Sequence, residues 1–216
     1  MFCQCAVSHG ILVRERVQPP GSLAGYIIGG VNLDQERELV ERAKDSKEAF
    51  GELYDAHYGR IFGYTLRRTA DVEVARDIAA TVFYEALRHI KDFRWRGVPF
   101  SHWLYRVANR EISDHYKKRK REVYGNSSVA DEDHPDPSKE LYSGEVERGK
   151  YEDYIELQSC IARLPPKYQE VLTLRYFEDR DMKDIAGILH KPEGTVKSLL
   201  HRGIEQLREM MEAEGQ

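Results

Sequence analysis

The chain has 216 residues, of which 41% are hydrophobic, and a formal net charge of −4, so it suits two small folded domains. Its longest apolar run, Gly25 to Val31, falls far short of the roughly 20 residues that a membrane-spanning helix needs, which excludes membrane insertion. Three cysteines and a start without the pattern of a secretory signal imply no disulfide framework and indicate a cytoplasmic protein.

The first half of the chain predicts an extension followed by a helical domain. Residues 1–34 contain Pro19-Pro20 and several glycines, so we expect a flexible N-terminal extension, and a translation start near Val31. Apolar residues then recur at helical spacing, with Asp45 or Ser46 as the cap of one helix, Asp71 as the cap of a second, and Ser101 opening a third. We expect these helices to share one core within residues 35–122.

The second half predicts a linker and another helical domain. Between Asp131 and Glu156 there are ten acidic residues against three basic ones, so residues 123–150 read as an acidic, flexible linker. In residues 151–216, Pro165-Pro166 ends one helix and starts the next. The predicted fold class is therefore all-α, with a helical bundle and a helix-turn-helix domain joined by a flexible linker.

Residues Met182 to Leu200 fit a helix-turn-helix. A small residue, Ala186, is expected where the two helices cross, and His190 falls at the turn position that needs positive φ. An ordinary helical hairpin would share this apolar spacing but would not explain the polar outer face. That face carries donors suited to phosphates and base edges in a major groove: Thr195, Lys197, Ser198, His201, Arg202 and Arg208.

A second candidate DNA-binding stretch mixes aromatic and basic residues. Five aromatic residues fall between Phe93 and Tyr105, a spacing that suits stacking on single-stranded DNA. We expect Phe100 and Trp103 in the core and Trp95 exposed; the other reading is that most of the aromatics are core and the basic tail is a solvated helix end. The candidate residues for this surface are Arg94, Trp95, Arg96, Asn109, Arg110, Lys117, Lys118 and Arg119.

Both halves resemble extracytoplasmic-function sigma factors of bacterial RNA polymerase. The run Phe100-Ser101-His102-Trp103-Leu104-Tyr105-Arg106-Val107-Ala108 is typical of their region two. Leu164-Pro165-Pro166-Lys167-Tyr168-Gln169-Glu170-Val171-Leu172 and Gly194-Thr195-Val196-Lys197-Ser198 are typical of their region four. The two resemblances cover about two thirds of the chain and occur in the order that the family shows.

The resemblance implies a function and a set of partners. It implies that the first domain binds core RNA polymerase through Asp77, Ile78, Thr81 and Glu85 and melts the promoter −10 element, capturing a flipped base in the loop before Ser101. It implies that Lys197, Ser198, His201 and Arg202 read the −35 element, that the linker threads through the polymerase, and that an anti-sigma factor is a partner. The family's Gln-Glu pair after Asp-Leu-Val is replaced here by Ala80-Thr81, so we expect altered docking.

Two alternatives stay open at this point. A helix-turn-helix regulator that is not a polymerase subunit would need a ligand or receiver domain, usually α/β, in place of the helical first half. A metal or redox sensor could use Cys3, Cys5, His9 and Cys160, but their spacing matches no strong zinc pattern. Because no phosphate loop, nucleophile elbow or paired-carboxylate site is apparent, we expect a non-enzymatic protein without metal or cofactor.

Overall fold

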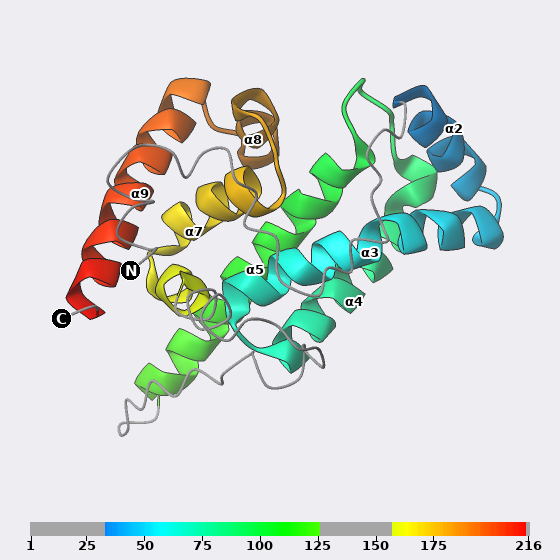
Figure 1. Cartoon of the computed structure of the whole chain (residues 1–216). Helices are drawn as coiled ribbons and strands as arrows, with labels where there is room; N and C mark the ends of the chain where they lie inside the picture. The colour runs from blue at the N-terminus through cyan, green and yellow to red at the C-terminus, as the bar shows by residue number, and fades with distance from the viewer. Residues whose placement is uncertain (1–32, 126–156, 215–216) are drawn as a thin grey trace, which may run out of the picture.

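The computed structural model describes residues 33–125 and 157–214. Throughout these two ranges the backbone is helix, turn or loop, which confirms the predicted all-α fold (Figure 1). The predicted extension and linker lie almost wholly outside the described residues, as do Cys3, Cys5 and His9. Within the described ranges no helix is long and apolar enough to cross a membrane, and no cluster of potential metal ligands forms. Cys160 is buried and accepts a hydrogen bond from Arg163 at 3.3 Å.

The N-terminal domain is a bundle whose helices begin where the sequence places capping residues. The Ser46 hydroxyl accepts the Ala49 N–H at 3.1 Å, and the Asp71 carboxylate accepts the Val74 N–H at 3.0 Å. Each such cap stabilises a helix by about 1 kcal/mol. The elements are α2 (Leu33–Ala43), α3 (Lys47–Thr69), α4 (Val72–His89), the short 3-10 helix η2 (Ile90–Asp92) and α5 (Phe100–Gly125).

One apolar stripe on each helix forms the core of this domain. The predicted stripe of α4 is buried along its whole length, and its alanines Ala75, Ala79 and Ala86 allow the neighbouring backbone to approach closely. The sequence predicted three helices here, whereas α2 is separate from α3 because the chain turns at Lys44 and Asp45. Val40 of α2 is fully buried, so this helix contributes to the same core.

The C-terminal domain contains a short helix at residues 157–163, followed by α7 (Pro166–Leu172), α8 (Met182–Leu189) and α9 (Glu193–Glu214). As predicted, Pro166 occupies the first turn of α7. A feature that the sequence did not predict is the π-helical turn η3 (Thr173–Phe177), in which the Glu178 N–H bonds to the Thr173 carbonyl at 3.1 Å. This wider turn redirects the chain from α7 towards α8.

Helices α8 and α9 form the predicted helix-turn-helix. His190 lies between them with φ 52°, in the left-handed region that the sequence assigned to it. Ile185 and Val196 are fully buried, and Leu200, 4% exposed, completes the core of the motif. A Cβ atom at Gly203 would lie 3.2 Å from the Leu172 side chain, so the absence of a side chain lets α9 pack closely on α7.

The two domains pack against each other, which the sequence did not predict. Helix α8 contacts α5, and η3 contacts α3, so one continuous apolar cluster spans both domains. Figure 1 shows α8 lying alongside α5, the longest helix of the N-terminal domain. The surfaces that carry candidate DNA contacts must therefore be described together with this interdomain interface.

Candidate nucleic-acid interface

The outer face of α9 presents five of the six residues that the sequence assigned to duplex DNA. Thr195, Lys197, Ser198, His201 and Arg202 are all exposed, because Val196, Leu200 and Gly203 face the core of the domain. The Ser198 hydroxyl donates to the Gly194 carbonyl at 2.9 Å, and His201 lies 3.3 Å from the exposed Glu205. These side chains therefore project from one side of a helix that can enter a major groove.

The loop between η2 and α5 encloses a cavity of about 620 Å³. Phe93 packs edge-on against Phe100, with ring centroids 5.2 Å apart, and Trp103 stacks on Phe100 at 5.8 Å. Gly97 adopts φ 74° in this loop, a conformation that favours glycine. Among the residues that line the cavity are Arg94, Arg96, Trp103, Arg106 and Arg110. An aromatic floor with guanidinium groups around it suits an unstacked nucleic-acid base and its phosphates.

The structure changes the expected roles of two aromatic residues. Trp95, expected to be exposed, is half-buried against the core. Trp103 packs against the core as expected, but it is only half-buried and also lines the cavity. Phe100 is buried as expected. Trp103 and Arg106 belong to the aromatic and basic stretch of the sequence, but neither was among the candidate DNA contacts. Their spacing with Arg110, three and seven residues from Trp103, is the helical signal that could have found them.

Asn109 does not lie on the exposed basic surface. It is half-buried, and its carbonyl oxygen accepts the Tyr64 hydroxyl at 2.6 Å and also the Arg68 guanidinium. Its assignment as a −10 contact is therefore corrected: α5 turns this side chain towards α3, whereas the neighbouring Arg110 points to solvent.

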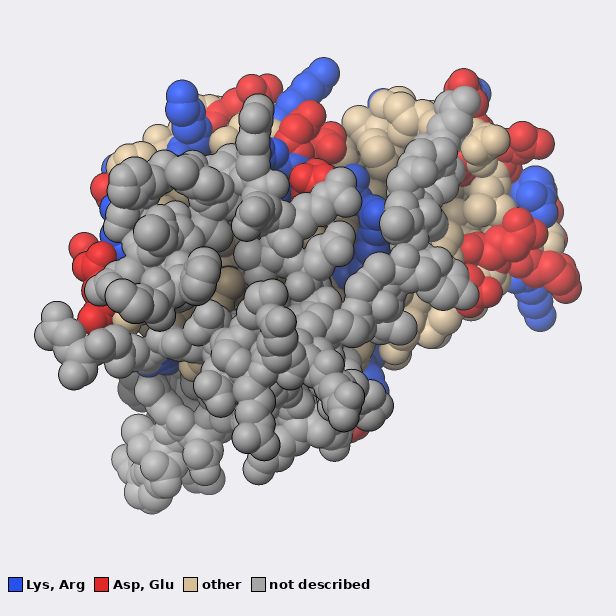
Figure 2. All heavy atoms as spheres, in the orientation of Figure 1, with Lys and Arg blue, Asp and Glu red and all other residues tan. Residues whose placement is uncertain are grey.

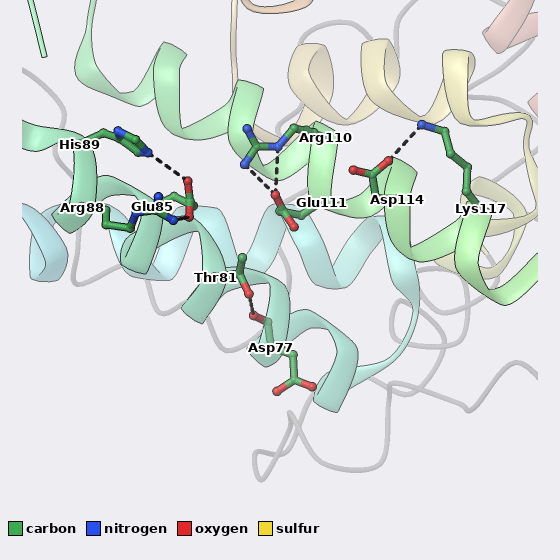
Figure 3. A network of polar contacts seen from close by, with 9 residues as sticks. All are labelled: Asp77, Thr81, Glu85, Arg88, His89, Arg110, Glu111, Asp114 and Lys117. Carbon is green, nitrogen blue, oxygen red and sulfur yellow. Dashed lines mark hydrogen bonds and ion pairs between the residues drawn. The ribbon is translucent and has the colours of Figure 1, made fainter. Parts of the chain in front are cut away.

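The basic side chains of α5 make only weak contacts with neighbouring acids (Figure 3). Arg110 lies 2.8 Å from Glu111, and Lys117 lies 3.0 Å from Asp114, with both cations more than half exposed. Lys118 and Arg119 are exposed on the same helix. Exposed ion pairs contribute about 0–1 kcal/mol, so these cations can exchange a carboxylate for a phosphate at little cost. On the face shown in Figure 2, basic and acidic side chains intermingle on both domains.

The outer face of α4 carries the residues assigned to the polymerase. Asp77 and Thr81 are exposed, and Glu85 is half-buried, 3.3 Å from both Arg88 and His89 (Figure 3). Ile78 is only 6% exposed, so its side chain belongs to the core and its assignment as a direct contact is corrected. Two residues that the sequence reasoning missed stand on the same exposed face: Tyr84, 61% exposed, and Leu87, 50% exposed.

Comparison with known proteins connects these surfaces to one family. Residues 53–122 match the model of sigma-70 region 2, and residues 154–207 match the model of sigma-70 region 4. The chain is 31% identical over 184 residues to the extracytoplasmic-function (ECF) RNA polymerase sigma factor SigW of Bacillus subtilis, covering 82% of the chain and 96% of that protein. The chain is an ECF sigma factor.

Other sigma factors match over similar lengths. The RNA polymerase sigma-H factor of Pseudomonas aeruginosa is 32% identical, with 81% of this chain and 92% of that protein covered. The ECF sigma factor BldN of Streptomyces coelicolor is 29% identical, but this sigma factor spans only 65% of its length. Because residues 53–122 match sigma-70 region 2, the alternative of a helix-turn-helix regulator that is not a polymerase subunit is wrong. Sigma factors are non-enzymatic subunits that direct promoter-specific transcription initiation.

Solved structures support the fold of this sigma factor. CnrH, in complex with the cytosolic domain of CnrY, superimposes with a TM-score of 0.59 at 19% identity, covering 82% of this chain and 97% of CnrH. RpoE of Bartonella quintana, in complex with the anti-sigma factor NepR, gives 0.60 at 20% identity, covering 76% and 96%. At these identities the likeness shows the fold alone.

Proposed function

We propose that this sigma factor reads the −35 element through the outer face of α9. The observation that carries this assignment is that Thr195, Lys197, Ser198, His201 and Arg202 are exposed together on one side of the second helix of the motif. Lysine and arginine neutralise phosphates, whereas Ser, Thr, His and Arg can donate to base edges. The inward residues of α9 are apolar or glycine, so the reading face bears no part of the core.

The cavity next to the loop 93–99 is the proposed site for a flipped base of the −10 element. Its aromatic wall offers stacking, and the guanidinium groups of Arg94, Arg96 and Arg110 lie around its opening, where phosphates of the displaced strand would run. Lys117, Lys118 and Arg119 extend the basic surface along α5 towards upstream DNA. Helix α5 would thus contact both the single-stranded and the double-stranded part of the promoter.

Docking to core polymerase is proposed for the exposed face of α4. Asp77, Thr81 and Glu85 supply polar groups, and Tyr84 and Leu87 supply apolar surface that the fold leaves uncovered. Ala80-Thr81 lacks the amide and carboxylate that the family usually has at this point. Burial of Tyr84 and Leu87 is the proposed compensation, since each buried side chain of this size contributes about 1.5–3 kcal/mol.

The proposed partners are core RNA polymerase, promoter DNA and an anti-sigma factor, and the proposed location is the cytoplasm, where polymerase works. The anti-sigma assignment has support from RpoE, whose solved structure contains the anti-sigma factor NepR. No residue of this sigma factor is assigned to that contact.

Run-off transcription with core polymerase on a genomic promoter library tests the proposed function. We expect specific transcripts only when both the polymerase and this sigma factor are present. Lys197→Ala should reduce them, and Lys167→Ala is the matched control, because Lys167 is an exposed lysine of the same domain that lies over the Tyr168 ring, on α7. Equal transcription from the two variants would contradict the assignment of α9.

A further inference from the structure

A second cavity, of about 240 Å³, is lined by residues of α3, α5 and α7. It shares no lining residue with the cavity proposed for the flipped base. One water occupies roughly 30 Å³ of liquid, so the second cavity has room for a phosphate together with a small organic group. The polar side chains of its wall are those of Arg68 from α3, Asn109, Ser113 and Lys117 from α5, and Glu170 from α7.

The wall contains a buried guanidinium whose charge is not neutralised by a carboxylate. Arg68 is 2% exposed, and no carboxylate oxygen of residues 33–125 or 157–214 lies within 4.0 Å of its nitrogens. Its hydrogen bonds go to neutral acceptors: the Tyr64 hydroxyl at 3.0 Å, the Gln169 amide oxygen at 3.4 Å, and the Asn109 amide oxygen. Because a buried charge is costly unless it is paired, this position favours an added anion.

The other two charged residues of the wall already have ion-pair partners. Glu170 lies 3.6 Å from Lys191, and Lys117 lies 3.0 Å from Asp114 (Figure 3). Burial raises the pKa of Glu170 above its ordinary value, whereas Arg68 and Lys191 oppose this rise. The residues that line the cavity therefore carry two positive charges and one negative charge.

Hydrogen-bond donors complete the wall. Nδ2 of Asn109 is buried and has no hydrogen-bond partner in the described part of the chain, although the oxygen of the same amide is bonded to Arg68. Buried polar groups in proteins are normally paired, so this N–H group is suited to an acceptor inside the cavity. The Ser113 hydroxyl is a second donor, and it belongs to an exposed residue at the edge of the wall.

We propose that this cavity binds a free phosphate monoester, with the phosphate between the Arg68 guanidinium and Nδ2 of Asn109. Guanidinium and ammonium groups are the side chains that recognise phosphate, and Lys117 supplies the ammonium group. Tyr116 and Pro166 also line the cavity and would contact the organic group of the ligand. A phosphodiester of DNA is continued by a nucleotide on both sides, so a guanidinium that is 2% exposed favours a small free ligand instead.

Isothermal titration calorimetry of the full chain at constant ionic strength tests this site, with phenyl phosphate as the probe. Dimethyl phosphate, a diester like the DNA backbone, is the comparison. We expect the monoester to bind about fivefold more tightly or better, because it carries about two negative charges at neutral pH and the diester carries one. Equal binding of the two probes would overturn the assignment to a monoester.

Asn109→Asp is the first variant for this test. The substitution keeps the size of the side chain but places a carboxylate beside Arg68, so the protein itself supplies the anion. We expect binding of phenyl phosphate to weaken about tenfold or more, because the new charge repels the ligand and pairs with the guanidinium. Gln35→Glu is the matched control, since it also lowers the net charge by one and lies on the exposed side of α2.

Ser113→Leu tests the cavity without any change of charge. A larger side chain at this exposed position of α5 occupies the edge of the cavity and should also weaken binding of phenyl phosphate. Ser159→Leu, at an exposed position of the helix 157–163, is its control. Circular dichroism shows whether each variant is folded, and if Asn109→Asp does not fold, Ser113→Leu decides alone.

Binding by both cavity variants that equals binding by their controls would overturn the proposal. Such a result would mean that phosphate binds adventitiously to the exposed basic residues of α5 or α9. Because transcription does not enter these measurements, their outcome is independent of the proposed function.

Discussion

The two DNA-reading helices differ in how much of each is available. On α9 every assigned residue, from Thr195 to Arg202, is exposed. On α5 the N-terminal turns are covered by region 4, so Ser101, His102 and Tyr105 are buried, and the first exposed residue of the helix is Arg110. The surface proposed for the −35 element is therefore accessible in the isolated chain, whereas the first turns of α5 are covered by region 4.

The largest expected effect on transcription comes from a substitution on the exposed face of α9. Arg202→Ala should reduce promoter-dependent initiation by roughly 5- to 150-fold, because a base or phosphate contact of this kind contributes about 1–3 kcal/mol. The free energy of unfolding of this variant should stay within about 0.5 kcal/mol of the wild-type value, since the side chain is exposed. Quantitative run-off transcription measures the first effect. Arg42→Ala, which removes an exposed arginine of α2, should leave initiation unchanged.

Two buried tyrosines allow the contact between α5 and region 4 to be tested. Tyr105 donates across the interface to Glu178, whereas Tyr64 donates within region 2 to Asn109. Replacing either by Phe should reduce the free energy of unfolding by about 0.5–1.5 kcal/mol, because a buried acceptor loses one of its two donors. Chemical denaturation measures this loss. Only Tyr105→Phe should also expand the molecule in small-angle scattering, and equal expansion of both variants would contradict the comparison.

His102 makes the covered helix sensitive to pH. Its pKa is lowered, mainly because burial penalises the charged imidazole; Asp184 and Glu36 oppose this shift, and Arg180 and Arg106 reinforce it. On acidification, His102 therefore takes up its proton at a higher pH in the unfolded chain than in the folded one. The contribution of neutral His102 to the free energy of unfolding is fully present above the ordinary pKa of 6.5 and is lost as the pH falls below it.

Denaturation at a series of pH values checks this sign. His102→Gln should flatten the dependence, whereas His201→Gln, at the exposed α9 face, should not alter it. A wild-type stability that rises on acidification through this range would contradict the assignment to His102.

The smallest expected effect comes from two left-handed residues with the same φ of 52°, Ala70 in region 2 and His190 in region 4. Ala70→Gly should stabilise the fold by up to about 1 kcal/mol, because a Cβ atom is unfavourable in this conformation. His190→Gly should gain less, since it also loses the contact with Arg106. Thermal denaturation of the pair measures the difference, and an equal gain would show that the His190 contact contributes nothing.

Local features of this sigma factor were predictable, because each depends on residues close in sequence. The caps at Ser46 and Asp71, the turn at His190 and the polar face of α9 each follow from a few neighbouring positions. The π-helical turn was not predictable, since Thr173 to Phe177 carries no distinct spacing.

The interdomain interface was beyond sequence reasoning for a different reason. Arg67 and Glu178 are 111 residues apart, and charged side chains at such positions read as solvated helix surface. The corrections at Ile78 and Asn109 have the same origin: which side of a helix faces a neighbour depends on packing that a single sequence does not reveal.

The close approach at Gly203 bears on how promoter preference can change over evolutionary time. Tyr168 and Leu172 leave almost no room for a side chain at this glycine. The orientation of α9 is therefore fixed by packing on its inner side, opposite the face proposed to contact DNA. Side chains on the opposite side can then be exchanged one at a time without disturbing that orientation. A change of promoter preference would then require substitutions only on the outer face of α9, and none at Tyr168, Leu172 or Gly203.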